Sequence, residues 1–256
     1  MHHIQFQKSA IDPSGAISNG WNLIKPNYAM YLGIVLLTWV LIACIPCLNV
    51  LLLGPISGGV YYVLLRDMRG EPVNFGMMFK GFEKFGTLLA IGVLQSLPGI
   101  IWQIVDTTAN VSTRIWSSSG SSSQTSEAEV LLIGGLAAVY VVFAIVFAVL
   151  SIVWAISFAF AIPLAAEHDI GPIEALKLSA RAGWSNVGGI IVTAILLMLI
   201  AIVGFLALCI GIFFVLPLFF ATWAFVYRQV FPSNEPMFPS GPPPPTAYGG
   251  SYGREM

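Results

Sequence analysis

Charged residues divide this chain into long charge-free stretches. Residues 26–65, 85–105, 130–166 and 182–227 contain no Asp, Glu, Lys or Arg. An apolar helix of about 20 residues crosses the hydrocarbon core of a bilayer, which is roughly 30 Å thick. The second stretch has the length of one such helix, and the first and fourth are long enough for two helices joined by a tight turn. The pattern therefore predicts an all-α polytopic membrane protein.

The stretch 130–166 decides the number of spans. As one helix it would be about 55 Å long at 1.5 Å per residue, and it has no turn residues near its centre. With one span there, the total is six, and ten of the eleven Lys and Arg residues lie on the side of the two termini. With two spans the split becomes six to five. Since cytoplasmic loops carry the excess of positive charge, we expect six spans with both termini in the cytoplasm. The spans are predicted near residues 28–45, 49–66, 87–105, 130–166, 188–206 and 209–228.

Two of the predicted hairpins repeat each other. A Gly-Trp pair precedes each hairpin, and Pro55 and Pro217 follow their tryptophans, Trp21 and Trp184, by 34 and 33 residues. An arginine follows each proline by 11 residues. The middle pair of spans is interpreted as a third, diverged copy with Pro163 as its proline and as the bend of the long fourth helix. The predicted architecture is three parallel repeats, each an interfacial helix followed by a transmembrane hairpin, related by an axis along the membrane normal. The three prolines are candidate helix hinges.

Each repeat opens with a short amphipathic stretch on the cytoplasmic side. In the second repeat a stripe of Phe75, Met78, Phe79, Phe82 and Phe85 opposes Lys80, Glu83 and Lys84, and we expect the two lysines to point to water. Such spacings suit helices that lie in the headgroup plane; the alternative is ordinary loop helices packed on the bundle. The residues expected at the interface are Trp21, Phe75, Phe79, Phe82, Phe85 and Trp184.

The predicted spans contain few polar side chains that could bind or transport a solute. Their interiors hold no ionisable residue, which argues against a proton-coupled or voltage-driven pump. Gln95 and Gln103 lie eight residues apart on about the same face of the third span. They are candidates to line a pathway, or they hydrogen-bond neighbouring helices. The small-xxx-small spacing of Gly54 and Gly58 predicts close helix packing.

The three cysteines are candidates for redox chemistry. Cys44 and Cys47 form a C-x-x-C motif at the outer turn of the first hairpin, and Cys209 lies at the corresponding turn of the last. Such thiols can form and break a disulfide, form a structural disulfide, or serve as small apolar residues in a membrane helix. The acidic and histidine side chains of residues 167–169 could bind metal. Adjacent helical positions do not converge on one ion, so we expect a solvated linker and no metal site.

The ends of the chain and its charge set further limits. A net charge of −1 gives no basic field for nucleic acid. Residues 1–27 lack the features of a cleaved signal peptide and are read as a cytoplasmic segment with an amphipathic helix. Residues 229–256 are rich in Pro, Gly and Tyr and are predicted to be a disordered cytoplasmic tail. The tail's run of four prolines could dock into an aromatic groove of a protein partner.

Several segments together resemble a bacterial integral membrane family of unknown function. That family is related to the membrane domain attached to some glycerophosphoryl diester phosphodiesterases. The resemblance covers most of residues 15–228; it implies a six-helix membrane domain and supplies no catalytic residues, and the chain has no room for a phosphodiesterase domain. The resembling segments are GPISGG at 54–59, RGEP at 69–72, MFKGFEKF at 78–85, PLAAEHD at 163–169 and ALKLS at 175–179.

These observations favour a non-enzymatic protein of the bacterial cytoplasmic membrane that organises lipids or partners at its cytoplasmic face. No cofactor is expected. One alternative is a transporter or channel for a small neutral or lipid-like solute, suggested by a proline in each repeat. A second is a membrane thiol oxidoreductase that uses Cys44 and Cys47.

Overall fold

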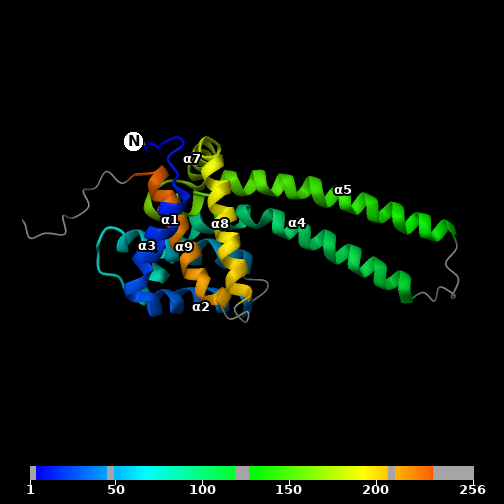
Figure 1. The fold of residues 1–256 in the computed structure, drawn as a ribbon, viewed down its shortest axis with the longest axis horizontal. Coiled ribbons are helices and arrows are strands. Elements are labelled where there is room, and N and C mark those ends of the chain that lie inside the picture. Colours follow the sequence, from blue (N-terminus) through cyan, green and yellow to red (C-terminus); the bar gives the residue numbers. More distant parts are fainter. Residues whose placement is uncertain (1–3, 45–48, 119–126, 207–210, 233–256) are drawn as a thin grey trace, which may run out of the picture.

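The described part of the protein is all-helical. The computed structural model describes residues 4–44, 49–118, 127–206 and 211–232, which form nine α-helices and two 3₁₀-helices (Figure 1). The α-helices are α1 (Pro13–Ile24), α2 (Tyr28–Cys44), α3 (Asn49–Asp67), α4 (Phe85–Ser118), α5 (Glu127–Phe158), α6 (Ala161–Glu167), α7 (Pro172–Ser185), α8 (Val187–Leu206) and α9 (Gly211–Val230); the 3₁₀-helices are η1 (Lys25–Asn27) and η2 (Phe75–Lys84).

Five segments of the described chain are long and apolar enough to cross a membrane, judged by length and composition. A sixth apolar segment, Val215–Val230 in α9, is shorter. The predicted all-α membrane class is therefore confirmed. The five longer segments are Pro13–Leu41, Val50–Asp67, Phe75–Val111, Gly134–Glu167 and Val187–Leu206.

Helices α4 and α5 form an arm. They leave the body of the protein together, lie side by side, and run across the direction of α8 in Figure 1. The Trp102 ring holds them together: its centroid lies 6.1 Å from that of Tyr140 and 5.6 Å from that of Phe147. Apolar side chains cover the outside of α5, and Leu136 and Val139 are 69% and 67% exposed. Such a surface is suited to lipid rather than to water.

The long apolar run 130–166 is broken into two helices. A single helix bent by Pro163 was expected, but α5 ends at Phe158 and α6 begins at Ala161. Pro163 sits in the first turn of α6, where a missing backbone N–H costs nothing. The run is therefore interrupted near Pro163, but by a break between two helices just before the proline rather than by a bend within one helix.

The side chain of Ser179 closes this break. Its Oγ accepts a hydrogen bond from the Phe160 backbone N–H at 3.0 Å and donates one to the Ser157 carbonyl oxygen at 2.8 Å. Ser179 lies on α7 and is fully buried. One hydroxyl thus satisfies two backbone groups that the broken helix leaves unpaired.

The first helix of each predicted repeat packs on the last membrane helix of another repeat. We call α1, η2 and α7 the entry helices. Helix α1 packs on α9, η2 on α3, and α7 on α5. The contacts are close because a glycine lies at each crossing. A Cβ on Gly81 of η2 would lie 2.0 Å from the Pro55 carbonyl oxygen and 2.6 Å from the Gly59 nitrogen. A Cβ on Gly20 of α1 would lie 3.1 Å from the nitrogen of Thr222.

The third entry helix completes a ring. A Cβ on Gly183 of α7 would lie 2.3 Å from the carbonyl oxygen of Ile156 in α5. Each entry helix therefore contacts the repeat that precedes it, and α1 at the N-terminal end closes the ring on α9. The contact on α5 precedes Pro163 by seven residues, whereas η2 meets α3 at Pro55 itself, so Pro163 does not occupy the place that Pro55 has in its repeat.

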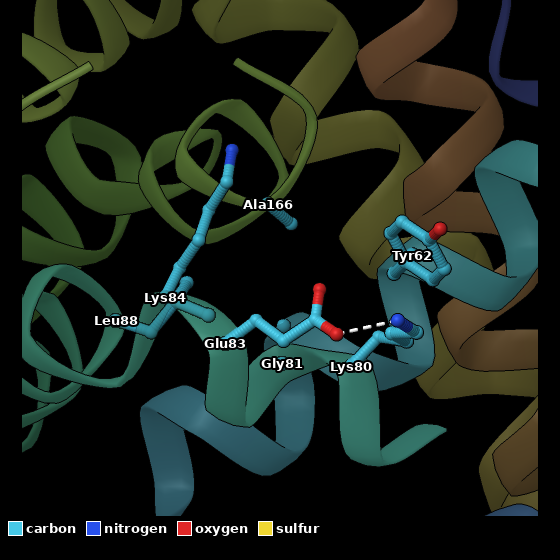
Figure 2. A pocket seen from close by; sticks show the side chains of 8 residues that line it. Tyr62, Lys80, Gly81, Glu83, Lys84, Leu88 and Ala166 are labelled. Atoms are coloured by element: carbon cyan, nitrogen blue, oxygen red, sulfur yellow. Dashed lines mark hydrogen bonds and ion pairs between the residues drawn. The ribbon is translucent and has the colours of Figure 1, made fainter. Parts of the chain in front are cut away.

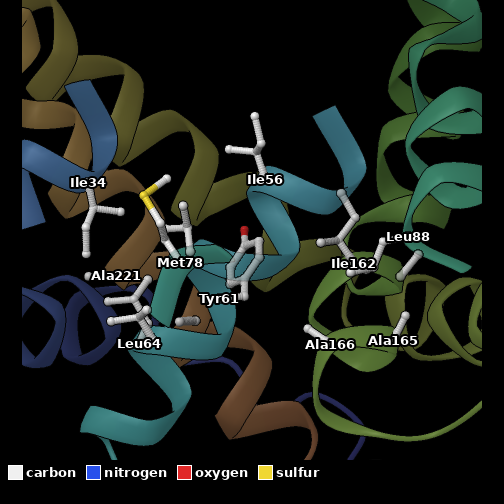
Figure 3. Close-up of a cluster of buried hydrophobic side chains, with 14 of the residues drawn as sticks. Ile34, Ile56, Tyr61, Leu64, Met78, Leu88, Ile162, Ala165, Ala166 and Ala221 are labelled. Carbon is white, nitrogen blue, oxygen red and sulfur yellow. The ribbon is translucent and has the colours of Figure 1, made fainter. Parts of the chain in front are cut away.

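Apolar side chains fill the space inside this ring. Figure 3 shows the larger of two buried clusters, where residues of α2, α3, η2, α4, α6 and α9 meet. Ile56 follows Pro55 directly and is 1% exposed, and Ala221 lies four residues after Pro217 and is 0% exposed. The described helices are therefore in direct contact at both prolines. The labelled members of the cluster are Ile34, Ile56, Tyr61, Leu64, Met78, Leu88, Ile162, Ala165, Ala166 and Ala221.

Candidate functional site

Helix η2 has three distinct rows of side chains. In a 3₁₀-helix the residues at i and i+3 eclipse each other, so a period of three along the sequence becomes a straight row. Met78 and Gly81 form the row that packs on α3; Met78 is 1% exposed. Lys80 and Glu83 form a polar row and pair with each other. The remaining row is aromatic.

The aromatic row lies at the surface. Ring centroids are 6.3 Å apart for Phe79 and Phe82 and 6.2 Å apart for Phe82 and Phe85. These side chains are 47%, 37% and 42% exposed, and Phe75, which packs over Gly33 of α2, is 40% exposed. A stacked, outward-facing aromatic ladder is a large apolar surface without a protein partner in the described chain.

The tryptophans of the other two entry helices are also exposed. Trp21 on α1 is 44% exposed and contacts Tyr28 in a tilted arrangement, with ring centroids 5.8 Å apart. Trp184 on α7 is 49% exposed and donates from Nε1 to Ser157 Oγ at 3.2 Å. All six residues predicted at the interface therefore keep more than a third of their surface free. Contact with a membrane stays a prediction, whereas complete burial against the bundle is excluded.

Lys84 has a structural role that its sequence position did not indicate. Its Nζ donates to the carbonyl oxygens of His168, at 2.9 Å, and of Ala165, at 3.3 Å, at the end of α6. A cation at this place satisfies free carbonyl groups and complements the negative end of the helix dipole. Lys80 extends to the surface as expected, but the expectation that Lys84 points to water was wrong.

A hollow of about 270 Å³ opens between η2, α3 and α6 (Figure 2). Lys80 and Glu83 lie on one side of it, Lys84 rises along another, and the Tyr62 ring stands on the α3 side. Tyr62 accepts a hydrogen bond from Arg66 Nη1 at 3.1 Å. The side chains of Lys80, Glu83 and Tyr62 thus border a space whose remaining lining is largely apolar, while the Lys84 ammonium points to the end of α6. The lining residues are Gly58, Tyr62, Lys80, Gly81, Glu83, Lys84, Leu88 and Ala166.

A network of charged side chains joins the ends of α3, α6 and α9 next to this hollow. Glu167 Oε1 lies 2.8 Å from Arg228 Nη2 and 3.5 Å from Arg69 Nη1. Glu167 Oε2 accepts a hydrogen bond from the Tyr227 hydroxyl at 2.5 Å. The Glu167 side chain is 12% exposed, so the expectation of a solvated linker was wrong at this position. A carboxylate so shielded requires these partners, because an unpaired buried charge is strongly unfavourable.

The second carboxylate of the network holds the end of α3. Glu71 bridges Arg66 and Arg69, at 2.5 Å and 2.6 Å from their Nε atoms. The hydrogen bond from Arg69, together with the charges of both arginines, holds the pKa of the Glu71 carboxyl below its usual range. Burial lowers the pKa of the neighbouring His168 imidazole; the charge of Glu167 opposes this shift.

The other predicted residues do not converge on this region. Pro55 and Pro217 lie inside α3 and α9, and their role as hinges stays a prediction. Gln95 is half-buried on α4, and no hydrogen-bond partner for its Oε1 lies among the described residues. Gln103 is exposed on the arm. The described structure therefore does not bring the two glutamines together in a polar pathway.

The thiol hypothesis falls mainly outside the described residues. Cys44 ends α2, but its side chain is not described, and Cys47, Cys209 and the tail from residue 233 lie outside the described chain. Within the described chain, no three His, Cys, Asp or Glu side chains are grouped to hold a metal ion. Redox activity and partner binding by the tail remain sequence-based predictions.

Comparison with protein-family models, curated proteins and solved structures finds no match to this chain. The resemblance stated from the sequence therefore stays a prediction.

Proposed function

We propose that this chain is a non-enzymatic integral membrane protein that organises lipids, and through them partners, at the cytoplasmic membrane face. The observation that carries the proposal is the aromatic row of η2. Three adjacent phenylalanine rings face outward from a helix whose Met78–Gly81 row packs closely on α3. The other two entry helices also carry an exposed aromatic side chain each, Trp21 on α1 and Trp184 on α7.

The arrangement matches an interfacial platform. Aromatic side chains favour the boundary between headgroups and acyl chains, and fully burying one is worth roughly 1.5–3 kcal/mol. The rows of η2 separate apolar contact from charge, because Lys80 and Glu83 occupy a different side from the phenylalanines. The predicted orientation, with these helices on the cytoplasmic side of the membrane, follows from the distribution of Lys and Arg.

The apolar packing inside the described helices supports this function over solute transport. A transporter needs a polar cavity near the middle of the membrane, formed where the helices are interrupted. Apolar side chains instead occupy the described space beside Pro55 and Pro217. The polar hollow lies at η2, next to the aromatic row, rather than between the two prolines.

Depth measurements test the proposal. A nitroxide label is placed at position 79, 80 or 82 of the full chain in phosphatidylglycerol-containing liposomes, after replacement of the native cysteines by alanine. Collision rates with oxygen and with an aqueous nickel complex are then compared. Labels at 79 and 82 should lie at headgroup–acyl depth and the label at 80 in water. Equal nickel accessibility at all three positions would remove the support for an interfacial platform.

The same liposomes test the transport alternative. Release of an entrapped small neutral solute, faster than from protein-free liposomes, would favour a channel or transporter. We expect no such release.

A further inference from the structure

We propose that the hollow beside η2 binds the phosphate group of an anionic phospholipid. This inference rests on the proposed function, because it assigns the lipid group that the entry helices bind at the cytoplasmic membrane face. The aromatic row and the polar row belong to η2, and η2 also forms one wall of the hollow, so a single ligand can contact all three.

The donors of the hollow suit a phosphate. The Tyr62 oxygen already accepts a hydrogen bond from Arg66, so its own O–H hydrogen remains to be donated. Lys80 adds an ammonium group, whereas the Lys84 ammonium is bonded to the carbonyl groups at the end of α6 and is not counted among the donors. A phosphate diester oxygen accepts hydrogen bonds and carries negative charge, and charge-assisted hydrogen bonds of this kind are the strong ones.

The size of the hollow fits a headgroup rather than a whole molecule. Pockets for drug-sized ligands begin at about 300 Å³, and this hollow measures about 270 Å³. Its floor is formed by small or aliphatic residues, among them Gly58, Gly81 and Leu88. A phosphate held there would leave the acyl chains of its lipid next to the exposed phenylalanines of η2, in the region where the proposed function places the bilayer.

Glu83 supplies the opposing charge. It pairs with Lys80 on the surface, where the two side chains are 64% and 47% exposed. An exposed pair of this kind contributes little to stability, so an incoming phosphate can replace the carboxylate as the partner of Lys80. The proposal therefore makes an unusual demand: loss of the Glu83 charge should strengthen binding, whereas loss of the Lys80 charge should weaken it.

Native mass spectrometry of the full chain in detergent measures this directly. Dioleoylphosphatidylglycerol is titrated against the unsubstituted protein and against Lys80→Gln, Tyr62→Phe and Glu83→Gln. Lys177→Gln serves as the matched control, because it removes one exposed lysine from α7, away from the hollow. Lys84 is left unchanged, since it also holds the end of α6. Dioleoylglycerol, which lacks the phosphate, and inorganic phosphate are titrated in parallel.

The expected pattern has two directions. Lys80→Gln should weaken phosphatidylglycerol binding about fivefold, since one basic residue near an anionic lipid surface contributes about that factor. Glu83→Gln should strengthen binding by a similar factor. Tyr62→Phe should weaken it severalfold through the loss of one hydrogen bond, and the control should change nothing. Binding of dioleoylglycerol should be insensitive to all four substitutions. Inorganic phosphate that binds as tightly as the lipid, with the same dependence on Lys80, would overturn the lipid assignment in favour of a soluble phosphate compound.

Failure here is separable from failure of the proposed function. Phosphatidylglycerol binding that ignores Lys80 and Glu83 overturns the phosphate site, even if labels at 79 and 82 remain at headgroup depth. Aqueous labels at 79 and 82 overturn the platform itself, whatever the lipid titration shows.

Discussion

Replacement of Ser179 by alanine tests how the break between α5 and α6 is held together. The hydroxyl satisfies the Phe160 N–H and the Ser157 carbonyl, and it is fully buried. A buried polar group left without a partner costs about 1–3 kcal/mol, so two such groups cost about 2–6 kcal/mol. Part of this is recovered if the helix ends rearrange, and we expect a loss of about 2–4 kcal/mol.

The loss should appear in thermal unfolding of the full chain in detergent. For a soluble protein of this size 1 kcal/mol lowers the unfolding temperature by roughly 2–4 °C, so Ser179→Ala should lower it by about 4–16 °C. Ser185→Ala is the matched control. It removes a serine hydroxyl from the same helix, but Ser185 is only half-buried and its Oγ donates to the Arg181 carbonyl in a solvent-exposed hydrogen bond, which water can replace.

The comparison of the two variants is decisive. Equal unfolding temperatures for Ser179→Ala and Ser185→Ala would show that the backbone groups at the break find other partners. The hydroxyl would then not be the reason that α5 stops at Phe158.

Three further predictions follow from the same contacts. Gly59→Ala should destabilise the fold strongly, because the new Cβ would lie 1.6 Å from the Met78 carbonyl oxygen. Gly99→Ala is the control and should leave the unfolding temperature unchanged, because a Cβ at that position meets open space. Glu167→Gln should lower the free energy of unfolding by about 3–5 kcal/mol, because it leaves the shielded Arg228 of α9 without its anion. Glu174→Gln, at an exposed position, should lower it by less than about 1 kcal/mol in the same denaturation assay. Burial lowers the folded-state pKa of His168 below its usual value near 6.5; the charges of Arg228 and Lys84 act in the same direction, and the charge of Glu167 opposes them. The unfolded chain therefore binds the proton more readily than the folded chain. Stability should therefore fall as the pH drops below about 6.5, and His168→Gln should reduce the difference in unfolding temperature between pH 7.5 and pH 5.5; an unchanged difference would contradict the assignment.

The amphipathic stretches show how far sequence reasoning reached at the candidate site. Of the five residues of the predicted stripe, Phe79, Phe82 and Phe85 form one row, with Lys80 on another side. Met78 is instead buried against α3, and Phe75 packs over α2. The spacing of 79, 82 and 85 is a period of three, which a 3₁₀-helix turns into a straight ladder. The predicted close packing at Gly54 is also confirmed, since a Cβ there would lie 1.9 Å from the Leu88 carbonyl oxygen.

Residues whose partners are distant in the chain were read incorrectly. Glu167 was expected in a solvated linker, yet its carboxylate binds Tyr227, 60 residues later. Lys84 was expected to face water, yet it binds carbonyl groups more than 80 residues away. The equal spacing of an arginine after Pro55 and after Pro217 was among the signals that predicted a repeat, and it did not indicate that Glu167 would join the ends of α3 and α9.

Membrane class and helix content follow from the sequence by itself, because the free energy of placing a charge in hydrocarbon is so unfavourable that charge-free stretches identify the spans without any tertiary contact. The aromatic face of η2 also follows from the sequence, because the spacing of Phe79, Phe82 and Phe85 places their side chains on one side of a 3₁₀-helix. The ring of entry helices, the break at Phe158 and the polar hollow depend on tertiary structure. Each requires backbones far apart in sequence to approach within contact distance, as Gly81 and Gly183 allow, and which glycine meets which helix is set by the packing of the whole chain.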